Sequence, residues 1–445
     1  MKKSKILIKN ASIVNYNSII KADILCEGKK ILLIDKNINV SDAKIIDATD
    51  KYAIPGGIDT HVHFSLPTFA GLTADDFLTG SRAALWGGTT TVIDFVTPLK
   101  NQSLIDAYKQ RREEASNALV NVFLHVSPIE WTDKTAQEMN ILVKEYGVKS
   151  FKVYMAYKNS IGIDDNTLIR VLETVGKLKA ITIVHCENDE IIEYLREQFY
   201  NSGRVSPKYH ALSRPRYSEA EAVNRLALYA SVLNVPVYVV HVSTQAAINL
   251  IKEKQREGVK FYAETCPQYL TFTEEMYNRP FEEAAKYVMS PPLRKEEDRF
   301  ALWDAIIDNT VSTIGTDHCS FTNEQKLLGR EDFRRIPNGA GGVEHRLEVL
   351  YTLGVNSGKI SMQDFVRLTS YNASVLFGLK GKGMIKQGYD ADIVIWNPKQ
   401  ERIISVENHK MNSDNNIYEG MQVVGQPEIV ILGGKIVKAQ GQFFI

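Results

Sequence analysis

The sequence predicts a (β/α)8 barrel of the TIM type, accompanied by a small β-sandwich that the two ends of the chain build together. Three observations support this fold class. Eight short apolar runs alternate with amphipathic segments between residues 56 and 379, a pattern typical of parallel βα units. Both ends of the chain are rich in β-branched residues and lack a helical period. The length of 445 residues also suffices for a barrel with insertions and one further domain.

The two ends of the chain have the same character. Short strands are predicted in the runs KILIKNASIV, ADILCEGKKILLID and AKIIDATDKYAI near the start, and in ADIVIWNP, QPEIVILGGKIVKA and GQFFI near the end. We therefore expect residues 1–55 and 380–445 to pair into the small sandwich domain. Residues 56–379 are left for the barrel domain.

The barrel strands are expected in eight runs of the central region. These runs are GGIDTHVHF, TTTVIDF, NVFLHVSP, SFKVYMAY, ITIVHCEN, PVYVVHVS, KFYAETCP and STIGTDHC. Segments such as NTLIRVLETVGKLKA place apolar residues at i, i+3 and i+4, which predicts covering helices. The widest gap between strands contains HALSRPRYSEAEA at residues 210–222, where we expect an inserted loop near the active face.

Charge and cysteine content exclude several classes of function. The chain carries 53 basic and 53 acidic residues, so it has no net attraction to nucleic acid or anionic lipid. Its four cysteines form no CxxC pair, which fits a reducing compartment. No apolar run approaches the ~18 residues of a membrane span, and the apolar start is too short for a signal peptide. We expect a cytoplasmic protein without a nucleic-acid or membrane partner.

The ionisable residues fall at the ends of predicted strands. His61 and His63 end the first strand, His185 the fifth, His241 the sixth and Asp317 the eighth. Barrel enzymes build their active sites from the carboxyl ends of several strands. The i, i+2 spacing of His61 and His63 places both rings on one face of a strand, as a divalent metal requires. A pair of structural histidines is the alternative, and the other strand-end residues favour the metal.

Lys152 lies inside the apolar run of the fourth strand. Most lysines are exposed, but a cation buried here is costly unless its pKa falls. A neutral amine beside metals is able to take up carbon dioxide and become a carbamate, which is an anionic ligand for two metal ions. Lys152 is therefore a candidate for this modification.

Eight motifs together carry a family resemblance that runs over nearly the whole chain. They are PGGIDTHVH (55–63), FKVYMAYK (151–158), VHCEN (184–188), VHVS (240–243), AETCPQYL (263–270), MSPPLR (289–294), GTDHCSF (315–321) and IPNG (336–339). In this order they resemble the cyclic amidohydrolases, and dihydropyrimidinases and hydantoinases most of all. The resemblance implies hydrolytic opening of a cyclic ureide or imide, either a 5,6-dihydropyrimidine or a 5-substituted hydantoin, to an N-carbamoyl amino acid.

The resemblance also implies a site with two divalent metal ions. His61, His63 and Asp317 would bind one ion, and His185 and His241 the other. Lys152, carboxylated by carbon dioxide to N6-carboxylysine, would bridge them. Zinc is the expected metal, with manganese or iron as alternatives.

Further roles follow from the same resemblance. Asp317 would also move the proton from the attacking water to the leaving nitrogen. Tyr157 would donate to the developing oxyanion, and Ser290 and Asn338 would hold the cyclic amide through main-chain groups. A homotetramer is expected.

The choice of activity within the family rests on smaller differences. Dihydroorotases commonly carry arginine where Ser65 stands, and allantoinases usually carry Pro-Gly where this chain has Pro67 and Thr68. Both differences favour a dihydropyrimidinase or hydantoinase, with allantoinase or another cyclic-ureide hydrolase as the alternative. A non-catalytic dihydropyrimidinase-like interaction protein is disfavoured because all six ligand positions are filled.

The remaining histidines and cysteines of the barrel are expected to pack rather than react. His318 should point away from the metals because it follows Asp317, so its strand parity is opposite. His125 is interpreted as a core histidine. Cys186, Cys266 and Cys319 lie near strand ends without a free histidine partner, so packing is their expected role.

Overall fold

Eight parallel strands form a barrel in the computed structural model, which describes residues 4–444. Residues 1–3 and 445 of the predicted β-rich ends therefore lie outside the described part. The barrel strands are β6 (Gly57–Val62), β9 (Thr89–Val96), β10 (Asn121–Val126), β11 (Ser150–Tyr154), β12 (Ile181–His185), β13 (Val237–Val239), β14 (Phe261–Thr265) and β15 (Thr313–Ile314). Each pairs with the next along the chain. A bridge between Val62 and His318 brings the last strand back to the first.

The sequences of these strands explain their position. Every residue of β9, β11 and β12 is buried, as expected for parallel strands that face the barrel interior on one side and helices on the other. The predicted (β/α)8 fold class is confirmed.

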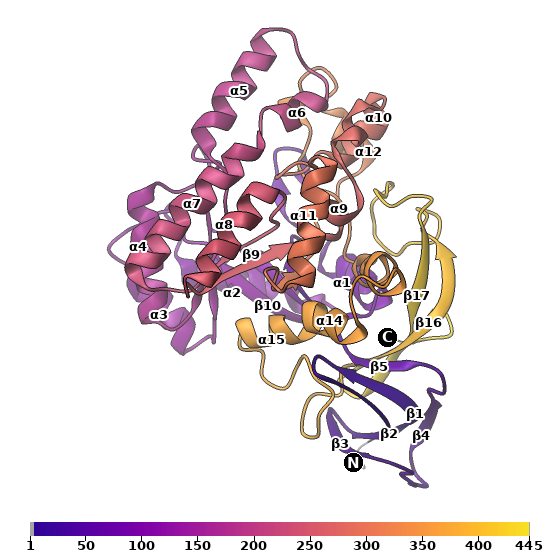
Figure 1. The fold of residues 1–445 in the computed structure, drawn as a ribbon. Helices are drawn as coiled ribbons and strands as arrows, with labels where there is room; N and C mark the ends of the chain where they lie inside the picture. Colours follow the sequence, from indigo (N-terminus) through magenta and orange to yellow (C-terminus); the bar gives the residue numbers. More distant parts are fainter. Residues whose placement is uncertain (1–3, 445) are drawn as a thin grey trace.

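Helices cover the outside of the barrel (Figure 1). They are α1 (Phe77–Trp86), α2 (Leu104–Glu114), α3 (Thr135–Lys144), α4 (Asp165–Lys177), α5 (Asp189–Asn201), α6 (Lys208–Leu212), α7 (Arg216–Leu233), α8 (Gln245–Arg256), α9 (Pro267–Thr271), α10 (Phe281–Ala284), α11 (Glu296–Ile307), α12 (Asn323–Leu327), α13 (Arg346–Leu350), α14 (Met362–Val366) and α15 (Asn372–Leu376). Helix α4 shows how the local sequence specifies a covering helix. Asp164 caps it by accepting from the Thr167 N–H at 2.8 Å, and Leu168, Val171, Leu172 and Val175 form its buried stripe.

The prediction of a loop at residues 210–222 is wrong, because most of this segment is helical. It contains the end of α6 and the first turns of α7, with Pro215 immediately before the first residue of α7. The Glu219 side chain is buried and accepts hydrogen bonds from the Ser243 N–H (2.9 Å) and Oγ (3.1 Å). These contacts from a distant segment stabilise a helix that the polar local sequence did not indicate.

The two ends of the chain form one β unit beside the barrel, as predicted. Its nine strands are β1 (Lys5–Asn15), β2 (Ser18–Glu27), β3 (Lys30–Asp35), β4 (Lys44–Asp47), β5 (Tyr52–Pro55), β16 (Ile393–Ile403), β17 (Gln422–Leu432), β18 (Lys435–Ala439) and β19 (Gln442–Phe443). The join is the antiparallel pair of β5 and β16, in which Ile54 lies opposite Val394. Figure 1 shows these strands together at one end of the molecule, with the indigo N-terminal and yellow C-terminal colours side by side.

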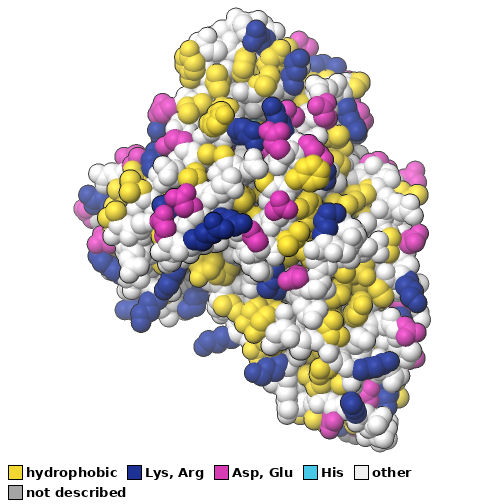
Figure 2. Space-filling view, viewed as in Figure 1, with side chains coloured by type: hydrophobic (Ala, Val, Ile, Leu, Met, Phe, Trp, Pro, Cys, Tyr) yellow, Lys and Arg dark blue, Asp and Glu magenta, His cyan; other side chains and the backbone are white. Residues whose placement is uncertain are grey.

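The surface is chemically mixed. Figure 2 shows Lys and Arg interspersed with Asp and Glu over the face that it displays, which agrees with the zero net charge of the chain. Within residues 4–444, none of the helices combines the length and the apolar character that crossing a bilayer requires.

Candidate metal centre

A cluster of two histidines and one carboxylate lies at the carboxyl end of the barrel. Asp317 Oδ1 is 3.1 Å from Nε2 of His61 and 3.1 Å from Nε2 of His63. One possible ligand atom from each of the three lies within 4.8 Å of the others. His61 belongs to β6 and His63 follows it, whereas Asp317 lies three residues after β15. The structure therefore brings together the three residues that the family resemblance assigned to one metal.

A second pair of histidines lies beside this cluster. Nδ1 of His185, the last residue of β12, is 2.9 Å from Nε2 of His241. The ring centroids of His241 and His61 are 5.5 Å apart, so the two groups share one site. The His241 Nδ1 atom is buried and has no hydrogen-bond partner in the described part of the chain.

Three residues of the site have an unusual backbone conformation. The φ angles of Tyr157, His241 and Asp317 are 64°, 40° and 51°. Non-glycine residues rarely adopt positive φ, and those that do cluster at functional sites. Because the chain turns sharply just beyond each strand, these side chains are directed over the barrel mouth instead of continuing the alternation of the strand.

Two buried glutamates orient the histidine rings. Glu264 Oε1 lies 2.8 Å from Nδ1 of His61, and Glu187 Oε2 lies 2.8 Å from Nε2 of His185. A carboxylate accepts a hydrogen bond from a ring nitrogen that carries a proton. In a neutral ring the opposite nitrogen then keeps its lone pair. In the neutral rings the lone pairs lie on His61 Nε2, next to Asp317, and on His185 Nδ1, next to His241. His61, whose pKa is raised, must lose its second proton before Nε2 can bind a metal ion.

The charges of the cluster are strongly coupled. Burial opposes protonation of His61, but the Asp317 and Glu264 carboxylates prevail and raise its pKa to about 9. Burial lowers the pKa of His63, His185 and His241, which favours the neutral, metal-binding form. Despite its burial, Asp317 has a pKa well below the usual range because His61 and His63 stabilise its anion.

Lys152 lies at the centre of β11 and is only 1% exposed. Its Nζ is 5.2 Å from the centroid of the Phe95 ring and 4.9 Å from that of Tyr154. Burial lowers the pKa of Lys152 to about 8, against the opposing effects of Asp317 and Glu264. A larger fraction of this amine is therefore in the neutral form that reacts with carbon dioxide than in an exposed lysine.

These donors fit a pair of divalent cations. Four imidazoles and a carboxylate are the ligand types that zinc and related ions prefer. His185 Nδ1 and His241 Nε2 lie 2.9 Å apart in the buried site, and hydrogen bonds to Glu187 and Glu264 fix the orientations of the His185 and His61 rings.

The predicted substrate-binding residues lie on separate segments of the same mouth. The Tyr157 ring is 5.2 Å from that of His185, and its N–H donates to Asp189 Oδ1 at 2.6 Å. Burial raises the pKa of Tyr157, against opposing effects of Arg214 and the Ser290 hydroxyl. Ser290 is buried, and the Asn338 Oδ1 atom is buried without a partner among the described residues.

The residues expected to pack do so. His318 accepts from the N–H of Gly342 at 3.0 Å and lies 3.2 Å from Asp75 Oδ2, away from Asp317. His125 is buried between Ser150 and the Thr60 carbonyl. All four cysteines are buried and free, and burial raises the pKa of the Cys186, Cys266 and Cys319 thiols, which makes them poor nucleophiles.

Sequence reasoning missed the buried acids behind the histidines. Glu264 is the penultimate residue of β14 and also accepts from the Tyr238 hydroxyl at 2.7 Å, and Glu187 pairs with the buried Arg214. A signal was available, since each glutamate stands at or just after the end of an apolar strand in the motifs AETCP and VHCEN.

Residues 52–437 match the model described as "Amidohydrolase family". The chain belongs to the amidohydrolase family. It is 42% identical over 440 residues to the D-hydantoinase of Geobacillus stearothermophilus, covering 98% of this chain and 93% of that protein. The dihydropyrimidinase of Dictyostelium discoideum is 41% identical over 437 residues, 97% of this chain and 87% of that protein. The crystal structure of dihydropyrimidinase from Brevibacillus agri matches with a TM-score of 0.97 and 40% identity, covering 99% of this chain and 96% of that chain.

Family membership agrees with the geometry. This amidohydrolase is an enzyme, and the family implies a binuclear metal centre, to which the His61, His63 and Asp317 cluster corresponds. All six residues that the sequence predicted as ligands lie at the barrel positions described above.

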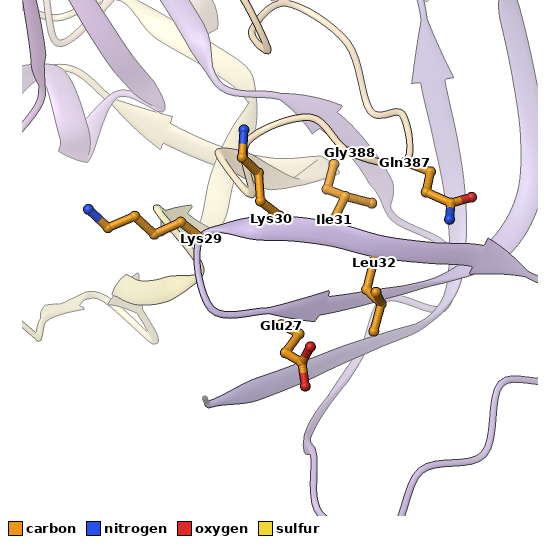
Figure 3. Close-up of a pocket in the computed structure, with 7 residues that line it drawn as sticks. All are labelled: Glu27, Lys29, Lys30, Ile31, Leu32, Gln387 and Gly388. Carbon is orange, nitrogen blue, oxygen red and sulfur yellow. The ribbon is translucent and has the colours of Figure 1, made fainter. Parts of the chain in front are cut away.

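A hollow of about 530 Å³ on the small sheet has a different character (Figure 3). It lies where β3 faces the loop before β16, and the Gly388 N–H donates to the Ile31 carbonyl there at 2.9 Å. Its lining residues are Glu27, Lys29, Lys30, Ile31, Leu32, Gln387 and Gly388. Because none of them is a histidine, a cysteine or a buried acid, we assign no catalytic chemistry to this hollow.

Proposed function

We propose that this amidohydrolase opens the ring of a 5,6-dihydropyrimidine or a 5-substituted hydantoin and releases an N-carbamoyl amino acid. Relatives named D-hydantoinase and dihydropyrimidinase match nearly the whole chain at about 40% identity, so cyclic amide hydrolysis is its reaction class. The observation that carries the proposal is the convergence of a complete ligand set, from five strands, on one buried site.

The proposed metal centre uses the residues named from the sequence. His61, His63 and Asp317 would hold one divalent ion and His185 and His241 the other, and Lys152 as a carbamate would supply an anionic ligand. When bound, two divalent ions would lower the pKa of a water molecule toward neutrality and so supply the nucleophile. Zinc suits this set of nitrogen and oxygen donors, and manganese or iron are alternatives.

The side chains of the enzyme then supply proton transfer and orientation. Asp317 takes the proton of the attacking water and delivers it to the ring nitrogen as the C–N bond breaks. Tyr157 donates from its phenol to the carbonyl oxygen, where negative charge develops in the transition state. Its raised pKa keeps this proton in place at neutral pH. Main-chain groups of Ser290 and Asn338 hold the ring amide.

A metal analysis and a substrate panel test the proposal. We expect close to two divalent ions per chain after growth with zinc, and ring opening of dihydrouracil, dihydrothymine or a 5-substituted hydantoin. Allantoin and dihydroorotate are the controls for the other activities of the family. Turnover of allantoin alone would replace our substrate assignment. Absence of both metal and turnover, with zinc and bicarbonate supplied, would leave a non-catalytic protein.

We also propose that the enzyme is a homotetramer. The resemblance implies this state, and helix α7 exposes Leu228 and Val232, 60% and 76% accessible, one turn apart. Apolar side chains exposed on one helix face favour self-association. Light scattering on the purified enzyme should give four times the chain mass of 50.1 kDa.

Two further expectations stay proposals. Residues 1–55 with 380–445 and residues 56–379 are proposed as separate domains, which limited proteolysis at the junctions would test. A cytoplasmic location agrees with four unpaired thiols, and cell fractionation would test it.

A further inference from the structure

Lys326 is a buried lysine whose ammonium group, among residues 4–444, forms hydrogen bonds only with main-chain carbonyls and lies near one aromatic ring. It lies in α12, is 3% exposed, and donates to the carbonyls of Val288, Pro337 and Gly339 at 3.0, 2.7 and 2.8 Å. The Nζ atom is also 5.5 Å from the centroid of the Phe321 ring. An ammonium has three protons, so every donor of this side chain is used.

The burial of this cation needs a reason. No acidic side chain forms an ion pair with Lys326 among residues 4–444, and burial lowers its pKa to about 7. A methionine of similar length would fill the space without this cost. What the lysine adds is therefore three hydrogen bonds to main-chain carbonyls, which an apolar side chain could not form.

The carbonyls belong to two segments that come from different loops. Val288 lies two residues before Ser290, and Pro337 and Gly339 stand on either side of Asn338. The Gly339 N–H also donates to the Val288 carbonyl at 3.0 Å, so the segments are in direct contact. Lys326 thus joins the two segments that contain the proposed substrate-holding main chain.

The main-chain carbonyls next to Ser290 and Asn338 accept hydrogen bonds, whereas the main-chain groups of these two residues form none within residues 4–444. The Met289 carbonyl accepts from His210 Nε2 at 2.8 Å, and the Pro291 carbonyl accepts from the Tyr269 hydroxyl at 2.7 Å. Within the described part of the chain, the N–H and C=O groups of Ser290 and Asn338 have no hydrogen-bond partner. Buried side chains therefore hold the main chain on either side of Ser290 and Asn338. The N–H and C=O groups of these two residues are left without a partner in the described part of the chain.

We propose that Lys326 is a positioning residue for ring opening, which holds the free main-chain groups of Ser290 and Asn338 toward one substrate amide. This inference rests on the proposed function of the site. Lys326 does not touch the substrate, so its loss should weaken substrate binding more than it slows the chemical step.

Lys326→Met is the variant that tests this role, since it removes the ammonium and keeps the length of the side chain. We expect KM to rise on the order of tenfold with a smaller change in kcat, the signature of lost binding in ground and transition state alike. Metal content should stay at the wild-type value. Hydrogen exchange of the peptides around 288–291 and 336–340 should accelerate together.

Lys438→Met is a matched control. Lys438 is also a buried lysine with a pKa lowered to about 7, and its Nζ donates to the Trp86 carbonyl at 2.7 Å, but it lies in β18 of the small sheet. Whatever this variant does to thermal stability, its KM and the exchange of both segments should equal those of the wild type. An equal rise in KM in both variants would overturn the proposal.

A conservative variant keeps the test decisive if Lys326→Met fails to fold. Lys326→Arg retains the charge but presents a planar guanidinium, so we expect a smaller rise in KM and intermediate exchange. Wild-type KM and wild-type exchange in the folded Lys326 variants would overturn the positioning role. If the wild-type enzyme opens no ring in the panel, the proposed function fails. The exchange data then still decide whether Lys326 joins the two segments.

Discussion

His61 acquires its role from a residue more than two hundred positions away. Glu264 holds Nδ1 of this ring, and Asp317 lies next to Nε2. Without the glutamate, a neutral imidazole could carry its proton on either nitrogen, and one tautomer would have no lone pair directed at the metal site. The ligand function is therefore a property of the hydrogen-bonded triad and not of histidine alone.

Lys152→Ala tests the proposed carbamate ligand. The substitution removes the amine that we propose becomes a carbamate, so the proposed metal centre would lose an anionic ligand. We expect metal content to fall and turnover to drop below detection, measured by elemental analysis and by the decrease in absorbance as hydantoin opens.

Lys152→Met provides the steric control for that experiment. It fills the space between Phe95 and Tyr154 with an apolar chain of similar length, so folding should be preserved while metal and activity are lost. Full activity in either variant would contradict the carbamate role. A wild-type metal content with no turnover would show that Lys152 is needed for the chemical step but not for metal binding.

Tyr157→Phe separates catalysis from metal binding. The phenol has no place in the proposed ligand set, so metal content should not change. Removing one oxyanion donor typically lowers kcat by roughly 10²–10³, and we expect a loss of this size with little change in KM. Steady-state kinetics on dihydrouracil measure both parameters, and an unaltered kcat would assign the oxyanion to other groups.

At the scale of elements, helix α1 shows how closely a covering helix approaches the metal-binding strand. A Cβ atom at Gly80 would lie 2.2 Å from Cε1 of Phe64, the residue that follows His63. The Phe64 ring has little freedom, because it packs against Phe77 and His318 with centroids 5.8 and 5.5 Å away. The glycine allows α1 to lie directly over the histidine motif.

Gly80→Ala should therefore act against the usual preference of helices. Alanine in a helix interior normally stabilises by about 1 kcal/mol relative to glycine, but overpacking a rigid core costs about 1–3 kcal/mol. We expect a lower thermal midpoint by scanning calorimetry. Gly342→Ala is the comparison, since its Cβ would meet Thr316 at an ordinary 3.7 Å. A higher midpoint for Gly80→Ala would show that Phe64 moves freely.

At the scale of the whole molecule, Lys438 connects the small sheet to the barrel. Its strand β18 belongs to the sheet, whereas the Trp86 carbonyl that it reaches ends helix α1. Burial lowers the pKa of Lys438 from 10.5 to about 7, with Arg402 adding to the shift and Glu348 and Glu344 opposing it. The junction between the two units thus contains a titratable group.

This group makes stability depend on pH in a defined direction. Between its folded pKa of about 7 and its unfolded value of 10.5, the unfolded chain binds a proton that the folded chain lacks. The free energy of unfolding therefore rises with pH in this window, whereas below it the destabilising contribution of Lys438 is constant and independent of pH. We expect the stability of the wild type relative to Lys438→Met to increase from about pH 7 to about pH 9 in urea titrations. An unchanged difference would show that Lys438 stays charged in the folded protein.

The sequence by itself determined the barrel, the β unit from the two ends and the set of candidate ligands. Each depends on local patterns: apolar runs that alternate with amphipathic segments, and histidines placed where such runs end. The positions of His61, His63, Lys152 and His185 at the ends or centres of strands follow from these patterns, because a strand fixes the direction of its side chains.

Only the tertiary structure decided which groups support those ligands. Glu264, Glu187 and Lys326 act on residues far away in the sequence, and no local pattern records a hydrogen bond between distant segments. The same reason explains the error at 210–222, where contacts from Glu219 to Ser243 stabilise a helix in a polar stretch. The positive φ angles of His241 and Asp317 are likewise seen only in the structure, because neither residue type favours this conformation by itself.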